Sequence, residues 1–169
     1  MVRESKNIEG KKNSLTLTLS QPIFIDTLYK INKNWAMNFS LEIGPKTDLD
    51  TIPALKDVYI TFLPGGDHKE TAEKAGELVK KGCNPIPHIP ARSIENDNHL
   101  KEYVNMCKDF GVKQCLVIGG SREPVGKFES SIQLLETGYF ESFKIGIAGH
   151  PEGSPDISDS ELEKAMQDK

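Results

Sequence analysis

The sequence predicts an α/β fold organised around a parallel sheet, and three observations support this. Five short apolar segments have the pattern of strands, and segments with helical spacing of apolar residues lie between them. The connections are long enough to hold the crossover helices that parallel strands require. The segment 83–90 contains three prolines and cannot be a helix interior, yet it lies between two helical segments, so we interpret it as a buried strand.

The first part of the chain has weaker patterns. Residues 1–13 are polar and charged, and we expect them to be mobile. Residues 15–19 alternate between apolar and polar types, which is compatible with a strand, and residues 22–35 have the rough spacing of an accessory helix. We therefore treat residues 1–37 as an amino-terminal extension and residues 38–169 as the domain proper.

Within the domain, strands and helices alternate. Strands are predicted at residues 39–43, 58–62, 83–90, 113–118 and 143–148. Helices are predicted around residues 72–79, 100–110 and 128–135. Gly82 and Gly111 follow the first two of these helices as stop signals, and Ser158 with Glu161 in the first turn predicts the start of a last helix that runs to the final residue.

Composition excludes several classes of protein. The 169 residues suffice for one domain with its own core, and the net charge of −4 argues against a nucleic-acid-binding protein. No apolar run approaches the ~20 residues of a membrane span, and the first residues lack the apolar segment of a signal peptide. The three cysteines have no CxxC spacing, which is typical of buried thiols in a reducing compartment. We expect a cytoplasmic protein.

Polar residues lie at the carboxyl ends of the predicted strands. The carboxyl ends of parallel strands meet at one edge of a sheet, where α/β proteins place their chemistry. The residues at these ends are Glu42, Thr61, His88, Ser121 and His150. The sequence therefore predicts a ligand site at this edge, with His88 in a central place.

Structural interpretations compete with this site. Glu42 is also compatible with an exposed edge carboxylate, His88 with a hydrogen-bonded core histidine, and the pair Gly119–Gly120 with an ordinary turn. The histidines have no HxxxH or HExxH spacing, so we expect no metal site. The chain has no GxGxxG or P-loop after a strand and no GxSxG, which argues against those nucleotide sites and acyl-transfer sites. Length alone favours an open doubly wound sheet, because an eight-stranded barrel needs ~200 residues or more.

Five strings, in order, resemble the amino-terminal part of the methylenetetrahydrofolate reductase family. They are SLEIGPKT, VYITFLPGG, PIPHIPARS, LVIGGS and IAGHPEGSPD, and the resemblance covers about residues 38–169. The resemblance implies an incomplete (β/α)8 TIM barrel of about five βα units, in place of the doubly wound sheet. It also implies an FAD-dependent enzyme that reduces 5,10-methylenetetrahydrofolate to 5-methyltetrahydrofolate with NADH or NADPH as hydride donor.

The resemblance assigns roles to individual residues. Glu42 matches the family's catalytic glutamate, which protonates a folate nitrogen and needs a partly shielded carboxyl. Thr61 and His88 match flavin contacts, and Lys169 matches a lysine that reaches the flavin phosphates. Further matches to the flavin site are Ile118, Gly119, Gly120, Ser121, Phe128, Ala148, His150 and Glu152.

The chain also departs from the family pattern. Ser121 stands where an aspartate is usual and supplies no negative charge, so the flavin potential and the folate preference can differ. Gly119 stands where arginine is frequent. The last three strands of the barrel are missing, which implies a truncated product, a homo-oligomer or a partner that supplies the missing half. Two alternatives therefore remain: a related folate-dependent one-carbon enzyme acting in demethylation, and a non-catalytic subunit.

Overall fold

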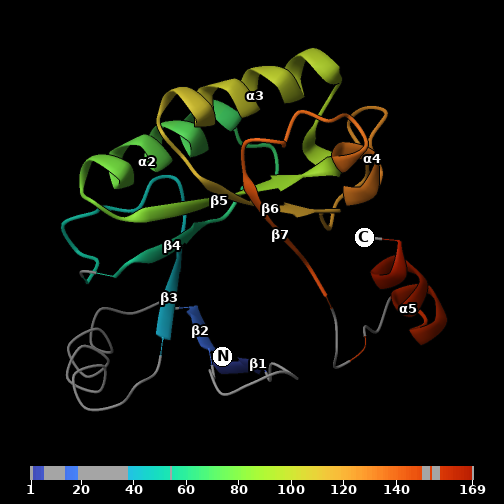
Figure 1. The fold of residues 1–169 in the computed structure, drawn as a ribbon, viewed down its shortest axis with the longest axis horizontal. Coiled ribbons are helices and arrows are strands. Elements are labelled where there is room, and N and C mark those ends of the chain that lie inside the picture. Colours follow the sequence, from blue (N-terminus) through green and yellow to red (C-terminus); the bar gives the residue numbers. More distant parts are fainter. Residues whose placement is uncertain are drawn as a thin grey trace.

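The computed structural model describes residues 2–5, 14–18, 38–53, 55–149, 153 and 157–168. These residues form one seven-stranded sheet whose spatial order follows the sequence from β1 to β7 (Figure 1). The strands are β1 Val2–Ser5, β2 Ser14–Thr18, β3 Asn38–Ile43, β4 Asp57–Ile60, β5 Asn84–Pro90, β6 Gln114–Ile118 and β7 Lys144–Ile147. β1 is antiparallel to β2, whereas every neighbouring pair from β2 to β7 is parallel.

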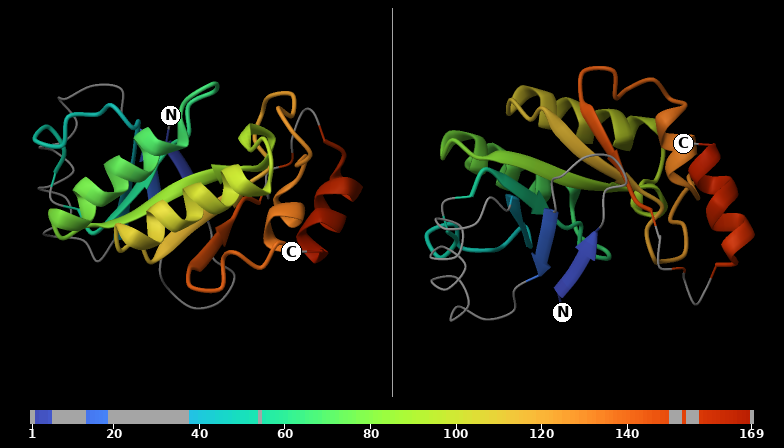
Figure 2. Two further views of the ribbon diagram at one scale, coloured as in Figure 1. Left: turned by 90° about the horizontal axis from the view of Figure 1, so that it is seen from above. Right: turned by 60° about the horizontal axis from the view of Figure 1, so that its bottom comes forward.

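The helices follow the parallel strands. They are α2 His68–Lys80, α3 Asp97–Asp109, α4 Ser131–Leu135 and α5 Asp159–Gln167, and the 3-10 turn η2 Ala91–Ser93 follows β5. α2 and α3 lie side by side across the same face of the sheet (Figures 1 and 2). Right-handed crossovers between strands in sequential order place successive helices on one side, whereas a doubly wound sheet reverses its strand order and is covered on both faces. The strand order is therefore not that of a doubly wound sheet.

Most predicted elements are confirmed, with shifted ends. β5 starts at Asn84 rather than at residue 83, β4 ends at Ile60 rather than at residue 62, and α4 starts at Ser131 rather than at residue 128. α5 begins after the predicted Ser158 cap, which forms a reciprocal capping box with Glu161, and it ends at Gln167.

The amino-terminal extension differs from its prediction. Val2–Ser5 forms strand β1 instead of a mobile segment, and its partner β2 continues the sheet beside β3. The segment 2–5 has no alternating apolar pattern that would have indicated a strand. The helix predicted at 22–35 lies outside the described residues.

The hydrophobic core lies between the sheet and the two long helices. Val58, Ile60, Ile89, Cys115 and Val117 are fully buried, and each alternates with residues that face the other side of its strand. Their partners on the helices are Ala72, Ala75, Leu78, Leu100, Tyr103 and Val104. The core thus holds β4, β5 and β6 through the residues that point toward α2 and α3. The alternate residues of these strands point to the opposite face of the sheet.

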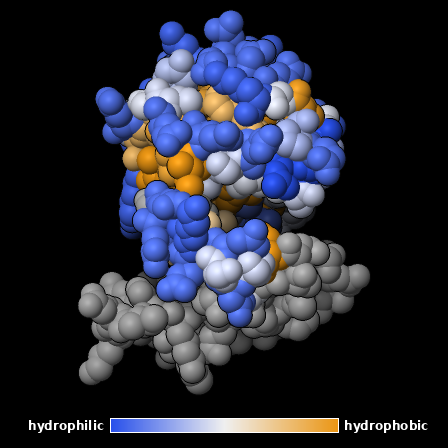
Figure 3. All heavy atoms as spheres, turned by 90° about the vertical axis from the view of Figure 1, so that its right-hand side faces the viewer, coloured by the Kyte–Doolittle hydropathy of each residue, from blue (hydrophilic) through white to orange (hydrophobic). Residues whose placement is uncertain are grey.

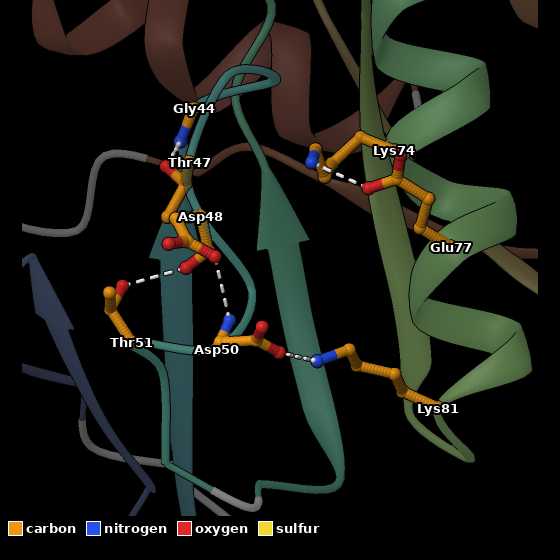
Figure 4. Close-up of polar contacts among 8 residues, drawn as sticks. All are labelled: Gly44, Thr47, Asp48, Asp50, Thr51, Lys74, Glu77 and Lys81. Carbon is orange, nitrogen blue, oxygen red and sulfur yellow. Dashed lines mark hydrogen bonds and ion pairs between the residues drawn. The ribbon is translucent and has the colours of Figure 1, made fainter.

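The loop after β3 is held by local hydrogen bonds (Figure 4). The Gly44 N–H donates to Thr47 Oγ1 at 3.1 Å, and the Thr51 hydroxyl donates to the Asp48 carbonyl at 2.7 Å. Lys81, at the end of α2, donates to Asp50 at 2.6 Å and lowers the pKa of that carboxyl. These hydrogen bonds therefore fix the conformation of the loop that follows β3.

The side of the molecule that carries α5 shows apolar patches among polar side chains (Figure 3). None of the α5 residues in the described part of the chain is buried, and Met166 is 50% exposed.

Within the described ranges, the structure contains no helix with the length and apolar character of a membrane span.

Candidate functional site

The strand register brings Glu42, Thr61 and His88 to the face of the sheet opposite the helices. Glu42 of β3 pairs with Tyr59 of β4, and Tyr59 pairs with Ile86 of β5. Continuing the same register by two residues places Thr61 beside His88. Because Val58 and Ile60 pack toward the helices, the alternate residues Tyr59 and Thr61 must face the other way. We call this the open face of the sheet.

His88 is the most deeply buried polar residue of the open face. Only 8% of its surface is exposed, and burial lowers its pKa to about 4, so the imidazole is neutral at pH 7. Its Nε2 atom is buried and has no hydrogen-bond partner among the described residues. A buried polar atom without a hydrogen-bond partner lowers the stability of the fold by roughly 1–3 kcal/mol. A hydrogen bond from this atom to a ligand or a water molecule would remove that cost.

The backbone at His88 is fixed from the helix side. The Tyr103 hydroxyl of α3 donates to the His88 carbonyl at 3.0 Å, and Tyr103 itself is fully buried. The strand continues past His88 to Pro90, and the next residues turn through η2. The imidazole is therefore carried by a rigid part of the fold, as a binding residue requires.

Tyr59 belongs to the same group, although the sequence interpretation did not select it. Its ring meets the His88 ring edge to face, with centroids 6.1 Å apart and planes at 69°. Burial raises the pKa of its hydroxyl, and the nearby Asp57 raises it further. The signal was present in the sequence: strand alternation puts Tyr59 on the same face as Thr61, two residues later.

Glu42 is half buried near the carboxyl end of β3. Its strand neighbours Leu41 and Ile43 are 4% and 6% exposed and anchor the strand in the core. The chain then turns at Gly44, where the hydrogen bond to Thr47 closes the turn. The carboxyl group is thus held on the open face in the same register row as Tyr59.

The residues that follow β6 lie at the edge of the sheet where the parallel strands end. Ile118 pairs with Pro90, and the Arg92 N–H donates to the Gly119 carbonyl at 3.0 Å. Gly120 has φ +91°, and a Cβ there would lie 3.3 Å from the Cβ of Pro90. Glycine is therefore required at position 120 by the backbone conformation. The next residue, Ser121, is exposed.

The remaining predicted site residues lie in the hydrophobic core, after β7 or outside the described residues. Phe128 is 4% exposed and belongs to the hydrophobic core, with the Lys127 ammonium 5.0 Å from its ring centroid. Ala148 is half buried and follows the last residue of β7, beside Ile118 in the continued register. His150, Glu152 and Lys169 lie outside the described residues.

The polar groups of this site come from neighbouring strands. The open face offers a carboxyl, a hydroxyl and a neutral imidazole from three adjacent strands, and a glycine exit from the fourth strand. Among the described residues, no three or more His, Cys, Asp or Glu side chains form a group that could hold a metal ion.

The chain matches no protein-family model.

Proposed function

We propose that this chain is a flavin-dependent reductase that converts 5,10-methylenetetrahydrofolate to 5-methyltetrahydrofolate, with FAD as cofactor and NADH or NADPH as hydride donor. The supporting observation is that Glu42, Thr61 and His88 share the open face of three adjacent parallel strands. We further propose that the sequentially ordered sheet, with α2 and α3 on one face, is part of a (β/α) barrel whose interior is the open face.

The residues present fit an FAD molecule. The unpartnered Nε2 of the neutral His88 can donate or accept one hydrogen bond, according to its tautomer. Gly119 has no side chain to keep a planar ring system away from the backbone, and a Cβ there would have no neighbour closer than 4.0 Å. When bound, FAD supplies the hydride-transfer chemistry that side chains lack.

In this proposal Glu42 is the proton donor. Its carboxyl transfers a proton to a nitrogen of the methylene bridge of the folate, and the C–N bond then opens to an iminium. The hydride completes the reduction of that carbon to a methyl group. A half-buried carboxyl on a rigid strand suits this role, because a donor must be held within hydrogen-bond reach of the atom that it protonates.

The test combines a binding assay and two activity assays on the full chain. We expect purified protein to bind FAD, to oxidise NADH or NADPH with reduction of the flavin, and to reduce methylenetetrahydrofolate. Glu42→Gln should abolish folate turnover and leave flavin reduction by the nicotinamide intact. Glu73→Gln, on the exposed surface of α2, is the matched control and should keep both activities. Loss of both activities in Glu42→Gln would contradict the proton-donor role.

Ser121 supports a second candidate, a folate-dependent enzyme that accepts one-carbon groups during demethylation. Its exposed hydroxyl follows the β6 exit and supplies no negative charge there. Bound flavin without nicotinamide-driven reduction of methylenetetrahydrofolate would favour this candidate. Failure to bind any flavin would exclude both candidates and favour a non-catalytic subunit.

A further inference from the structure

A pair of histidines lies on the helix-covered side of the sheet, where α2 meets α3. His68 is the first residue of α2, and His99 lies in the first turn of α3. Their ring centroids are 4.5 Å apart with planes at 53°. The His68 side chain is buried in this contact, and the His99 side chain is half buried.

Neighbouring groups determine which nitrogen of each ring carries the proton. His99 Nδ1 accepts a hydrogen bond from the Glu95 N–H at 3.2 Å, so the proton of the neutral ring is on Nε2. His68 Nδ1 lies 3.3 Å from Asp67 Oδ1, a carboxylate oxygen that favours a proton on Nδ1. The Nε2 atoms of both rings are buried and have no hydrogen-bond partner among the described residues.

Charged groups from both helices surround the pair. Glu102 of α3 lies with Oε1 3.8 Å from His68 Nε2, but the Lys69 ammonium of α2 holds that carboxylate at 3.1 Å. Burial and the neighbouring His99 lower the pKa of His68, whereas Asp67 and Glu102 act in the opposite direction and Lys69 adds to the lowering. The neutral state of His68 is thus favoured by packing.

Tyr103 connects this pair to the candidate site. Its ring centroid lies 5.5 Å from that of His68, and its hydroxyl donates to the His88 carbonyl at 3.0 Å. One fully buried side chain therefore packs near His68 with its ring and contacts the backbone of β5 with its hydroxyl.

We infer that His68 and His99 form an acid-sensitive contact between α2 and α3, which Tyr103 couples to the backbone at His88. An added proton on His68 goes to the buried Nε2 atom beside the other imidazole. An added proton on His99 goes to Nδ1, which can then no longer accept from Glu95. Either event weakens the contact at the start of α3, four residues before Tyr103. This inference does not depend on the proposed reaction.

The first experiment measures the pKa of each imidazole by NMR in the full chain. His99→Phe retains a ring but removes a like charge, so the pKa of His68 should rise toward its ordinary value. His99→Gln should act in the same direction and keeps an acceptor for the Glu95 N–H. Glu102→Gln removes a carboxylate and should lower the pKa of His68. An unchanged pKa of His68 in the two His99 variants would overturn the inference.

The second experiment follows the amide signal of Ile89, which shares its peptide group with the His88 carbonyl. As the pH is lowered from 7, this signal should shift with the same midpoint as the imidazole signals of His68, and the imidazole signals of His88, whose pKa is lowered to about 4, are followed separately. In Tyr103→Phe the hydroxyl is absent, so His68 should still titrate but the Ile89 signal should no longer follow it. An Ile89 signal that is insensitive to His68 in the wild type, or that follows it equally in Tyr103→Phe, would refute the coupling.

Discussion

The helix-covered face and the open face of the sheet are built from alternate residues of the same strands, yet they differ in chemistry. On β4, Val58 and Ile60 are fully buried against the helices, while Tyr59 and Thr61, the residue that follows β4, are half buried and polar on the open face. On β5, Ile89 lies on the helix-covered side and His88 on the open side. The helix-covered face of these strands is apolar, whereas the open face combines polar side chains with the apolar Ile86 and Leu116.

This difference separates stability from function. A close-packed apolar face contributes most to the free energy of unfolding, whereas a polar face with an unpartnered imidazole nitrogen reduces stability and suits a ligand. Substitutions on the two faces should therefore have distinct effects, even at adjacent positions of one strand.

The largest effect on stability is expected on the helix-covered face. Ile60→Ala should lower the free energy of unfolding by about 3 kcal/mol, because it leaves a cavity in the core. Thr61→Val, at the next position on the open face, should change it by less than about 1 kcal/mol. Urea denaturation followed by circular dichroism measures both, and similar losses would contradict the comparison.

A smaller loss is expected at the exit of β6. Gly120→Ala should lower the free energy of unfolding by about 1–2 kcal/mol, because an alanine is strained at φ +91° and its Cβ meets Pro90. The adjacent Gly119→Ala is the matched control: its Cβ would have no neighbour closer than 4.0 Å, the Glu129 carbonyl oxygen. Equal stability of the two variants would show that the positive φ carries no cost.

The pH dependence of stability should reveal the neutral imidazole of the open face. Burial lowers the pKa of His88 from 6.5 to about 4, so the unfolded chain binds a proton more readily than the folded chain. Stability is therefore lost as the pH falls below 6.5, by about 1 kcal/mol between pH 6.5 and pH 5.5 from this group. His88→Phe should remove this contribution. An unchanged pH dependence in the variant would place the His88 imidazole in solvent.

The smallest effect is expected at the surface ion pair shown in Figure 4. Asp50 and Lys81 are both exposed, so solvent screens their attraction. Asp50→Asn should leave the denaturation midpoint unchanged within error. A clear decrease would mean that the loop after β3 contributes more to the fold than its exposure indicates.

The sequence predicted much of the fold because the strands and helices carry strong patterns. The proline-rich strand β5 was identified by excluding a helix, and the α5 cap by the spacing of Ser158 and Glu161. Strand β1 was missed, because it is specified by pairing with β2 and not by local alternation. Strand neighbours cannot be derived from local patterns, since they depend on how the whole chain packs.

The candidate site was predicted only in part for the same reason. The predicted strand ends indicate Glu42, Thr61 and His88. Tyr59 was missed because a tyrosine inside a strand is equally typical of the core, and only the register shows that it meets His88. Phe128, selected by resemblance alone, lies in the hydrophobic core, where its burial already accounts for an aromatic residue.

The central claim, that the open face binds FAD at His88, is tested most directly by NMR of the three described histidines during titration with FAD. The proposal predicts that the imidazole signals of His88 shift or broaden in a saturable manner. Those of His68 and His99, on the helix-covered side, should change much less. Unchanged His88 signals at saturating FAD, or larger changes at His68 and His99, would contradict it.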